Sequence, residues 1–337
     1  MIGVCLIGCG RAGLIHGRNF ARGVIEGARL TALADPVSEA LENARKELGD
    51  IPSYTDYREA LEKSDVDAVI IVSPTKYHCE IVLNAAAAGK HILCEKPMAM
   101  NEDECERMID AAKKNNVKLQ IGFMRRFDAS FVEAKNMLDA GEIGDVVLIK
   151  SHTRGPSIPQ PWMYDIRKSN GPLAEVNSHD IDTLRWFGQS EFKSVYAISG
   201  NYRCPDARSD FPDFYDNVLM TCSFENGVQG CIDGAQGVGY GYDAQTEIVG
   251  THGVIRVGRT QEQFVTACSS KDGRIKTPHV TSWRKLFIDA YCAEDQHFID
   301  CIEKDETPSV TGFDGKMAVR VVNAGNLSII EKRIVTL

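Results

Sequence analysis

The chain has 337 residues, enough for two compact domains, and 43% of them are hydrophobic, which supplies a core for each. Its 47 acidic residues outnumber 38 lysines and arginines, and the net charge of -9 argues against nucleic acid as a partner, because phosphate binding needs a basic face. No apolar run approaches the roughly 18 residues of a membrane span, and no basic segment or small-residue cleavage site accompanies the apolar start. The 11 cysteines form no C-x-x-C pair, which is typical of reduced thiols. We therefore expect a globular cytoplasmic protein without a membrane segment.

The first third of the chain alternates short apolar runs with helical segments, which is typical of repeated β-α units and a parallel sheet. The predicted strands are residues 2–7, 30–34, 68–72, 91–93 and 118–121. The predicted helices are residues 12–21, 38–48, 75–88 and 102–114. Asn101 precedes the last of these helices and is a suitable N-cap for it.

The pattern changes after residue 123, where strands begin to outnumber helices. The predicted helices here are residues 129–140, 172–187, 287–303 and 315–330. The predicted strands are residues 146–153, 194–199, 217–224, 228–233, 245–249 and 263–267. A loop rich in proline and glycine, residues 155–171, follows the first of these strands. This order predicts an α/β domain of residues 1–122 and an α+β domain of residues 123–337 with a mostly antiparallel sheet. The last helix could pack back toward the N-terminal domain.

The first strand ends in a glycine-rich turn with the pattern G-x-G-x-x-G. The turn is Gly8-Cys9-Gly10-Arg11-Ala12-Gly13. A strand precedes it and a helix follows it, as a dinucleotide-binding turn requires. Gly8 would form the turn, Gly10 would let the backbone approach a pyrophosphate, and Gly13 would let the helix pack on the strand. The helix N-terminus would then receive the negative charge.

Asp35 ends the second predicted strand, at the position where a carboxylate contacts the ribose of a bound dinucleotide. Its charge accepts a hydrogen bond from a ribose 2'-hydroxyl and repels a 2'-phosphate, and the following Pro36-Val37 offers no cation to compensate. We therefore predict NAD as the cofactor and regard NADP as less favoured. The alternative is that the glycines form only a tight turn and Asp35 only caps the next helix.

Six motifs spread over the chain give it a resemblance to the Gfo/Idh/MocA oxidoreductase family. Besides the glycine-rich turn, these are Ser73-Pro74-Thr75, Glu95-Lys96-Pro97, Gly122-Phe123-Met124-Arg125-Arg126-Phe127-Asp128, His179-Asp180-Ile181-Asp182 and Gly312-Phe313-Asp314-Gly315-Lys316-Met317-Ala318. Glu-Lys-Pro is the most specific of them. The motif of residues 122–128, with its two arginines, is similar to the corresponding motif of the inositol 2-dehydrogenase branch.

The resemblance implies a Rossmann domain followed by a domain with an open-faced sheet that binds substrate and joins copies of the chain. The expected oligomer is a dimer or tetramer packed through that sheet. The resemblance also implies that Lys96 reaches the substrate and that the Lys96–Pro97 bond is cis. The predicted cofactor-binding residues are Gly8, Gly10, Arg11, Ala12, Gly13, Asp35, Ser73, Thr75, His78, Glu95 and Lys96.

Hydride transfer from an alcohol needs a base for the hydroxyl proton and a cation or donor for the developing alkoxide. Lys96 is the candidate cation, because it ends a strand just before a proline that restrains its backbone. His179 is the candidate base, because an imidazole exchanges protons near neutral pH. Glu175 and Asp182 share its face of the predicted helix, so a carboxylate can orient the ring. The alternatives are a solvated lysine and a histidine that belongs to the core.

Glu175 departs from the pattern of the inositol dehydrogenases, which usually have aspartate at this position. The extra methylene shifts the carboxylate, so either the substrate differs in shape from myo-inositol or Glu175 has another role. Glu175 and His179 are also spaced like two metal ligands, but no further histidine or cysteine lies at motif spacing, and we predict no metal.

The loop after residue 155 carries aromatic residues that suit the wall of a sugar pocket, because aromatic faces pack on C–H surfaces. The predicted substrate-binding residues are Arg126, His152, Trp162, Tyr164, Asp182 and Tyr242, with Arg126 and Tyr242 taken chiefly from the resemblance. Trp162 and Tyr164 could instead fasten the loop to the core.

Together these features predict an NAD-dependent dehydrogenase that oxidises a secondary hydroxyl of a cyclic polyol, similar to myo- or scyllo-inositol. Within the family the alternatives are a pyranose or amino-sugar dehydrogenase, a ketose reductase, or an enzyme that cycles tightly bound NAD. An alternative of another class is a sensor that binds NAD(H) without catalysis, although a sensor needs neither Lys96 nor His179.

Overall fold

The computed structural model describes residues 1–263, 265–269 and 274–337. They form two compact units, and each unit is made from two separate stretches of the chain. The first unit comprises Met1–Phe127 and Ile288–Arg320, and the second comprises Asp128–Phe287 and Val321–Leu337. Residues that are far apart in the sequence therefore share one core in each unit.

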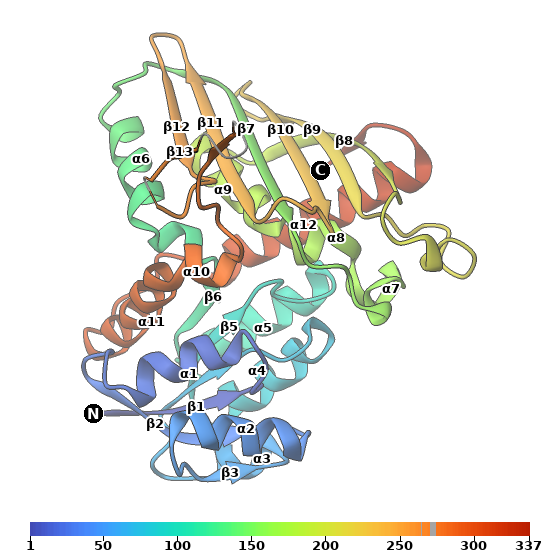
Figure 1. Cartoon of the computed structure of the whole chain (residues 1–337). Coiled ribbons are helices and arrows are strands. Elements are labelled where there is room, and N and C mark those ends of the chain that lie inside the picture. Colours follow the sequence, from blue (N-terminus) through green and yellow to red (C-terminus); the bar gives the residue numbers. More distant parts are fainter. Residues whose placement is uncertain (264, 270–273) are drawn as a thin grey trace. The chain divides into compact units, whose positions relative to one another are not determined.

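A six-stranded parallel sheet forms the centre of the first unit (Figure 1). Its order, β3-β2-β1-β4-β5-β6, places the first strand in the middle and confirms the predicted doubly wound fold. The strands are β1 (Ile2–Ile7), β2 (Ala28–Ala34), β3 (Ser53–Tyr54), β4 (Ala68–Ile71), β5 (His91–Glu95) and β6 (Leu119–Gly122). The sequence predicts all of these strands except the two-residue β3.

The helices of the first unit bury the apolar strands. They are α1 (Gly13–Ala21), α2 (Ser38–Leu48), α3 (Tyr57–Leu61), α4 (His78–Ala87), α5 (Glu102–Lys114) and α11 (Ile288–Glu303). Asn101 caps α5 as predicted, because its side chain accepts a hydrogen bond from the Glu104 N–H. Phe298 of α11 packs with Leu6 and Leu93 of the central strands in one buried cluster. The first unit thus takes part of its core from near the end of the chain.

A seven-stranded sheet with the order β12-β11-β7-β10-β9-β8-β15 forms the second unit. Its strands are β7 (Val146–Gly155), β8 (Phe192–Gly200), β9 (Asn217–Phe224), β10 (Gln229–Gln236), β11 (Asp243–Gly250), β12 (Val254–Gly258) and β15 (Val335–Thr336). Only β7 and β10 pair in parallel among these strands of the described chain, so the prediction of a mostly antiparallel sheet is confirmed.

Helices cover one face of this sheet (Figure 1). They are α6 (Ala129–Asp139), α8 (Gly171–Glu175), α9 (Ser178–Gly188) and the second half of α12 (Gly312–Glu331). Burial alternates along β9 accordingly, because Val218 and Met220 are buried while Leu219 is 43% exposed. A Cβ at Gly325 would lie 2.8 Å from Leu173 and 3.1 Å from Met220, so the missing side chain lets α12 approach its neighbours closely.

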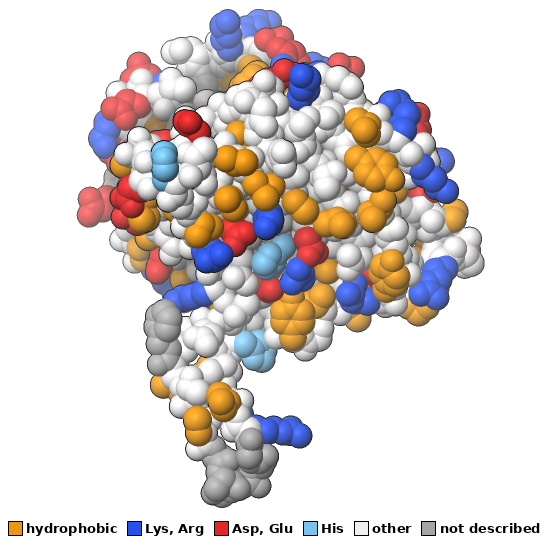
Figure 2. Space-filling view, turned by 90° about the horizontal axis from the view of Figure 1, so that it is seen from above, with side chains coloured by type: hydrophobic (Ala, Val, Ile, Leu, Met, Phe, Trp, Pro, Cys, Tyr) orange, Lys and Arg blue, Asp and Glu red, His pale blue; other side chains and the backbone are white. Residues whose placement is uncertain are grey.

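The other face of the sheet has no helix of the described chain against its middle strands and carries alternating apolar and charged side chains. Tyr196 and Ile198 of β8 are 40% and 52% exposed. Near the opposite edge of the sheet, Glu247 of β11 pairs with Lys150 at 3.1 Å and with Arg256 at 2.8 Å. A view of the molecule from above shows hydrophobic patches separated by side chains of both charges (Figure 2). We call the face of the sheet that carries Tyr196, Ile198, Lys150 and Glu247 the open face.

One predicted element differs from the structure, and another falls partly outside the described residues. The single helix predicted for residues 172–187 is two helices, α8 and α9, with a turn at Val176 and Asn177 between them. The strand predicted for residues 263–267 includes residue 264, which lies outside the described residues; β13 (Ala267–Ser269) pairs with β14 (Arg274–Lys276) next to it. None of the helices in the described part of the chain combines the length and the apolarity needed to cross a membrane.

Candidate active site

The glycine-rich turn lies at the carboxyl end of β1 and leads into α1. Gly8 has a φ of +101°, and a Cβ there would lie 2.6 Å from the carbonyl oxygen of Val72, so only glycine fits. A Cβ at Gly10, in contrast, would meet no atom within 4 Å. The turn is therefore closed toward the sheet and open at Gly10, which fits close approach of a pyrophosphate to the backbone.

The start of α1 is suited to an anion. Ala12 precedes the helix and provides no side-chain cap, and no acidic residue occupies the first turn. Its first backbone N–H groups and the positive end of its dipole therefore meet no competing carboxylate from its own first turn. Arg11 is exposed beside them.

Asp35 follows β2 and joins two segments of the nucleotide half of the site. One carboxylate oxygen accepts a hydrogen bond from the N–H of Cys9 at 2.8 Å, and the other accepts one from the N–H of Val37 at 2.9 Å. These two bonds fix the carboxylate at the carboxyl ends of β1 and β2, where the sequence predicts it to meet the ribose.

Ser73, Thr75 and His78 follow β4 at the same edge of the sheet. His78 is 1% exposed, and its two ring nitrogens lie 2.7 Å from the carbonyl oxygen of Ser73 and 2.9 Å from that of Pro97. The structure therefore gives His78 a bridging position between the two loops that follow β4 and β5. Direct contact of His78 with a cofactor stays a prediction.

The Glu95-Lys96-Pro97 motif ends β5, and the Lys96–Pro97 bond is cis, as the resemblance implies. Glu95 is 5% exposed, and its carboxylate accepts a hydrogen bond from the Lys96 N–H at 3.0 Å. Gly122 stands beside Glu95 in the register of β5 and β6, and a Cβ there would lie 2.9 Å from the carboxyl carbon. The glycine leaves room for this carboxylate at the strand end.

His179 and Asp182 lie on α9 of the second unit and are 6% and 2% exposed. Glu175 is the last residue of α8, so a turn and not a continuous helix joins it to His179. The prediction that Glu175 and His179 lie four residues apart on one face of a single helix is wrong, because the backbone between them bends at Val176 and Asn177.

A buried polar network holds the start of α9 on the covered face of the sheet. Asn177 donates to Asp180 at 2.8 Å, and the Ser151 hydroxyl of β7 donates to the same carboxylate at 2.6 Å. Asn177 packs directly against Gly234 of β10, where any Cβ would collide with its amide. This network fixes the orientation of α9 and, with it, the position of the His179 backbone.

Arg126 belongs to the first unit, and the other predicted substrate-binding residues belong to the second. Tyr242 packs edge-on against Phe287 at 6.4 Å and is 7% exposed, and Trp162 is 52% exposed. His152 lies on the open face, where its Nε2 is 3.0 Å from Asp243, whereas its strand neighbour Ser151 faces α9. The structure therefore does not bring His152 together with His179.

Arg126 and Tyr164 each have a defined partner. Arg126 pairs with Asp314 at 3.1 Å within the first unit. Tyr164 packs in a small buried cluster with Phe214, and its hydroxyl donates to Asp206 at 3.0 Å. Burial is the largest cause that raises the pKa of Tyr164, to about 12, and the contact with Asp206 adds to it. Tyr164 thus fastens its loop to a core of its own.

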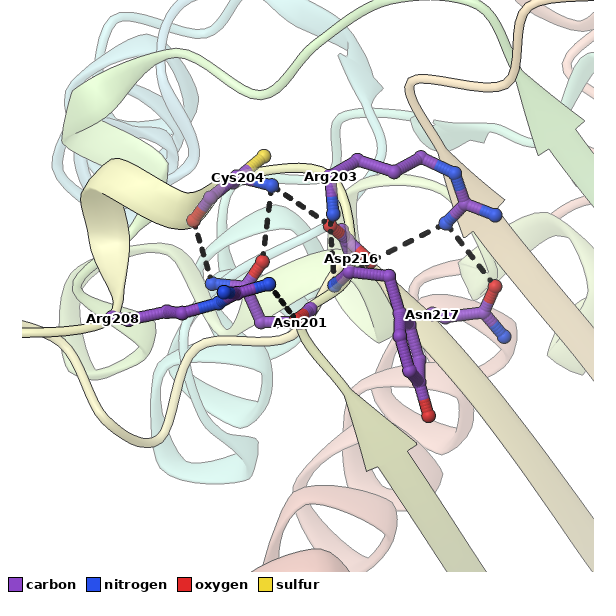
Figure 3. Close-up of polar contacts among 7 residues, drawn as sticks. Asn201, Arg203, Cys204, Arg208, Asp216 and Asn217 are labelled. Carbon is purple, nitrogen blue, oxygen red and sulfur yellow. Dashed lines mark hydrogen bonds and ion pairs between the residues drawn. The ribbon is translucent and has the colours of Figure 1, made fainter.

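The segment that covers this small cluster is held by one buried carboxylate, Asp216 (Figure 3). It accepts hydrogen bonds from the backbone N–H groups of Tyr202, Arg203 and Cys204. The Arg203 guanidinium lies 3.3 Å from the same carboxylate. Asp216 therefore orders the connection between β8 and β9.

Comparison with known proteins decides the family. Residues 2–123 match the model of an oxidoreductase family with an NAD-binding Rossmann fold, and residues 131–256 match the C-terminal domain of Gfo/Idh/MocA proteins. The chain belongs to the Gfo/Idh/MocA oxidoreductase family. The NAD-binding domain of this Gfo/Idh/MocA protein is the part that carries the glycine-rich turn and Asp35.

Several relatives of this Gfo/Idh/MocA protein are similar over nearly its whole length. It is 34% identical to scyllo-inositol 2-dehydrogenase (NAD(+)) of Bacillus subtilis, over 94% of this chain and 90% of that protein. It is also 34% identical to myo-inositol 2-dehydrogenase of Thermotoga maritima, over 98% and 97%. Its structure matches scyllo-inositol dehydrogenase of Lactobacillus casei with bound cofactor NAD(H) and scyllo-inositol, with a TM-score of 0.90, 30% identity, and coverage of 100% and 99%.

Three residues of this Gfo/Idh/MocA protein whose position the sequence does not predict lie near the first residue of the Glu-Lys-Pro motif. His16 and Glu294 lie close to the Glu95 carboxylate, and Asp295 contacts His16. His16 follows Gly13 by three residues, so its helical position could have indicated that it faces the sheet. Nothing in the local sequence marks Glu294 or Asp295, because their neighbours lie almost 200 residues or more away in the chain.

Proposed function

We propose that this protein is an NAD-dependent dehydrogenase that oxidises a secondary hydroxyl of a cyclic polyol, similar to myo- or scyllo-inositol, to the ketone. The observation that carries the proposal is its similarity, along nearly the whole chain, to proteins named as scyllo- and myo-inositol 2-dehydrogenases. The open space at Gly10 and the fixed carboxylate of Asp35 support NAD as the hydride acceptor.

In the proposed reaction the hydroxyl proton goes to His179 and the hydride of the same carbon goes to NAD, so the alcohol loses two electrons. NAD would supply only the hydride acceptor, held at the glycine-rich turn and Asp35. The ammonium of Lys96 would stabilise the alkoxide that develops, and the carboxylate of Glu175 would orient the imidazole. The restrained backbone of Lys96 and the anchored start of α9 support these roles.

We further propose that a second copy of the chain covers the open face. Tyr196, Ile198 and Leu219 are exposed there on adjacent strands, and an apolar group of this kind is typical of a protein interface. Replacing Leu219 by Glu should lower the oligomer size measured by light scattering on a sizing column. An unchanged mass would refute this arrangement.

Two substitutions test the chemistry. Lys96→Ala and His179→Ala should each lower kcat by about 10²- to 10⁴-fold, because a positioned acid-base group contributes that much, while NAD binding stays nearly unchanged. Lys193→Ala and His252→Ala, on residues outside the proposed site, are the matched controls and should keep full activity. Full activity in the His179→Ala variant would refute the assigned base.

A further inference from the structure

A buried charged cluster in the first unit lies behind the Glu-Lys-Pro motif. Its centre is His16 of α1, which is 0% exposed. Glu95 at the end of β5 and Asp295 of α11 flank the ring and are 5% and 0% exposed. Three elements from distant parts of the chain therefore place two carboxylates and one imidazole together, away from solvent.

Both ring nitrogens of His16 face carboxylate oxygens. Nδ1 lies 2.6 Å from Oδ1 of Asp295, and Nε2 lies 3.2 Å from Oε1 of Glu95. Asn19, one turn further along α1, donates to the other oxygen of Asp295 at 2.7 Å. Ionised carboxylates only accept hydrogen bonds, so a ring between two of them donates from both nitrogens and carries a positive charge. The two contacts of His16 fit an imidazolium between two carboxylates.

The Glu95 carboxylate continues the contact to Lys96. Its Oε1 faces His16, and its Oε2 accepts the Lys96 N–H at 3.0 Å. Gly122 borders it on the other side, where a Cβ would lie 3.1 Å from Oε2. A shift of this carboxylate would therefore shift the backbone at Lys96.

We propose that His16 is a positioning residue that holds the Glu95 carboxylate and, through it, the backbone of Lys96; the inference rests on the proposed role of Lys96 in catalysis. His16 belongs to the helix that begins at the glycine-rich turn. The contact therefore links the dinucleotide half of the site to the lysine that would stabilise the alkoxide.

The surrounding charges favour this state. Burial alone would lower the pKa of His16, but Asp295 and Glu95 outweigh burial and raise that pKa well above its ordinary value. Glu294 is 0% exposed beside them, and neither of its carboxylate oxygens has a hydrogen-bond partner among the described residues. Burial, followed by repulsion from Glu95, raises the pKa of Glu294 well above its ordinary value.

A metal ion is the alternative occupant of this cluster. Donor atoms of His16, Glu95 and Glu294 lie within 4.8 Å of one another. A structural metal site that is closed to water requires four ligands, and the described residues add no fourth ligand to this group. A proton on His16 satisfies both observed contacts without a further ligand. Metal content is therefore a direct discriminating measurement.

Two substitutions separate the two contacts of the ring. In His16→Gln the amide nitrogen lies near the position of Nε2 and keeps the donor for Glu95. In His16→Asn the amide lies near the position of Nδ1 and keeps the donor for Asp295. We expect His16→Asn to lower kcat on the order of 10²-fold with little change in NADH affinity, because misplacement by about 1 Å has this effect. His16→Gln should retain kcat within a few-fold.

The measurements are kcat, KM, NADH affinity by fluorescence, melting temperature and metal content, with native protein beside both variants. A lower kcat in His16→Asn that His16→Gln rescues supports the positioning role. Equal kcat in the two variants, whether high or low, refutes it, because a merely structural histidine would affect both alike. One equivalent of metal in native protein that both variants lose also refutes it.

Failure of the proposed function gives a different pattern. If native protein oxidises no polyol with NAD, the function is wrong, and the contact is then tested by nitrogen NMR. His16 should show two protonated ring nitrogens, and the Lys96 amide signal should move in His16→Asn but much less in His16→Gln. A neutral ring, or an unmoved Lys96 signal, refutes the contact independently of turnover.

Discussion

Replacing Asp35 by Ala should change both stability and cofactor choice. The substitution removes the acceptors for the N–H groups of Cys9 and Val37. Cys9 is 3% exposed, so water cannot replace the carboxylate as the acceptor for its N–H. Val37 is 56% exposed, and there water can replace the carboxylate. We therefore expect one unsatisfied buried donor and a free energy of unfolding that is lower by about 1–3 kcal/mol.

The same substitution removes a negative charge from the predicted ribose position. Two like charges about 4 Å apart repel by about 1 kcal/mol in water and by about 4 kcal/mol near a protein surface. Each 1.4 kcal/mol corresponds to about a tenfold change in affinity, so the ratio of kcat/KM with NAD to kcat/KM with NADP should fall by about tenfold or more. Asp35→Asn keeps the shape and one acceptor but loses the charge, so it should change the ratio with a smaller loss of stability. An unchanged ratio in both variants would refute the role of Asp35.

Two further predictions concern stability. Glu294→Gln should raise the free energy of unfolding at neutral pH but much less near pH 4. The pKa of Glu294 is raised in the folded state, so the unfolded chain releases the carboxyl proton at a lower pH than the folded protein does. Above the ordinary pKa of a glutamate this release stabilises the unfolded chain, and glutamine removes that effect. Urea unfolding at the two pH values measures this, and equal changes at both would contradict the raised pKa of Glu294. Asp216→Ala should destabilise the second unit by about 1–3 kcal/mol, because the buried N–H of Cys204 loses one of its two acceptors, whereas water can replace the carboxylate at the exposed Tyr202 and Arg203. Its thermal unfolding should begin at a lower temperature, and an unchanged melting curve would show that another acceptor replaces the carboxylate.

The nucleotide half of the first unit could be predicted from the sequence because its signals are local. The glycine-rich turn, Asp35 and the apolar strands each depend on residues within one β-α unit, and the structure places them at one edge of the sheet. The strand order also follows from the connections that such units allow.

The rest of the site depends on contacts between distant segments. Asp295 meets His16 across 279 residues of sequence, and no pattern along α11 distinguishes a buried carboxylate from one on a solvated face. The break before α9 was missed for a similar reason. Asn177 turns inward to pack on Gly234 of β10 and to bond Asp180, and this tertiary packing overrides the helical pattern of the local sequence.

The most direct test of the account is NADH formation, followed by absorbance, with myo-inositol, scyllo-inositol and a panel of aldoses, with NAD and NADP in parallel. The account predicts an NAD-linked rate on an inositol that exceeds the rate on every aldose, and a much lower rate with NADP. Activity on a pyranose alone would mean that Glu175 marks another substrate class. No oxidation of any polyol or sugar would contradict the proposed function.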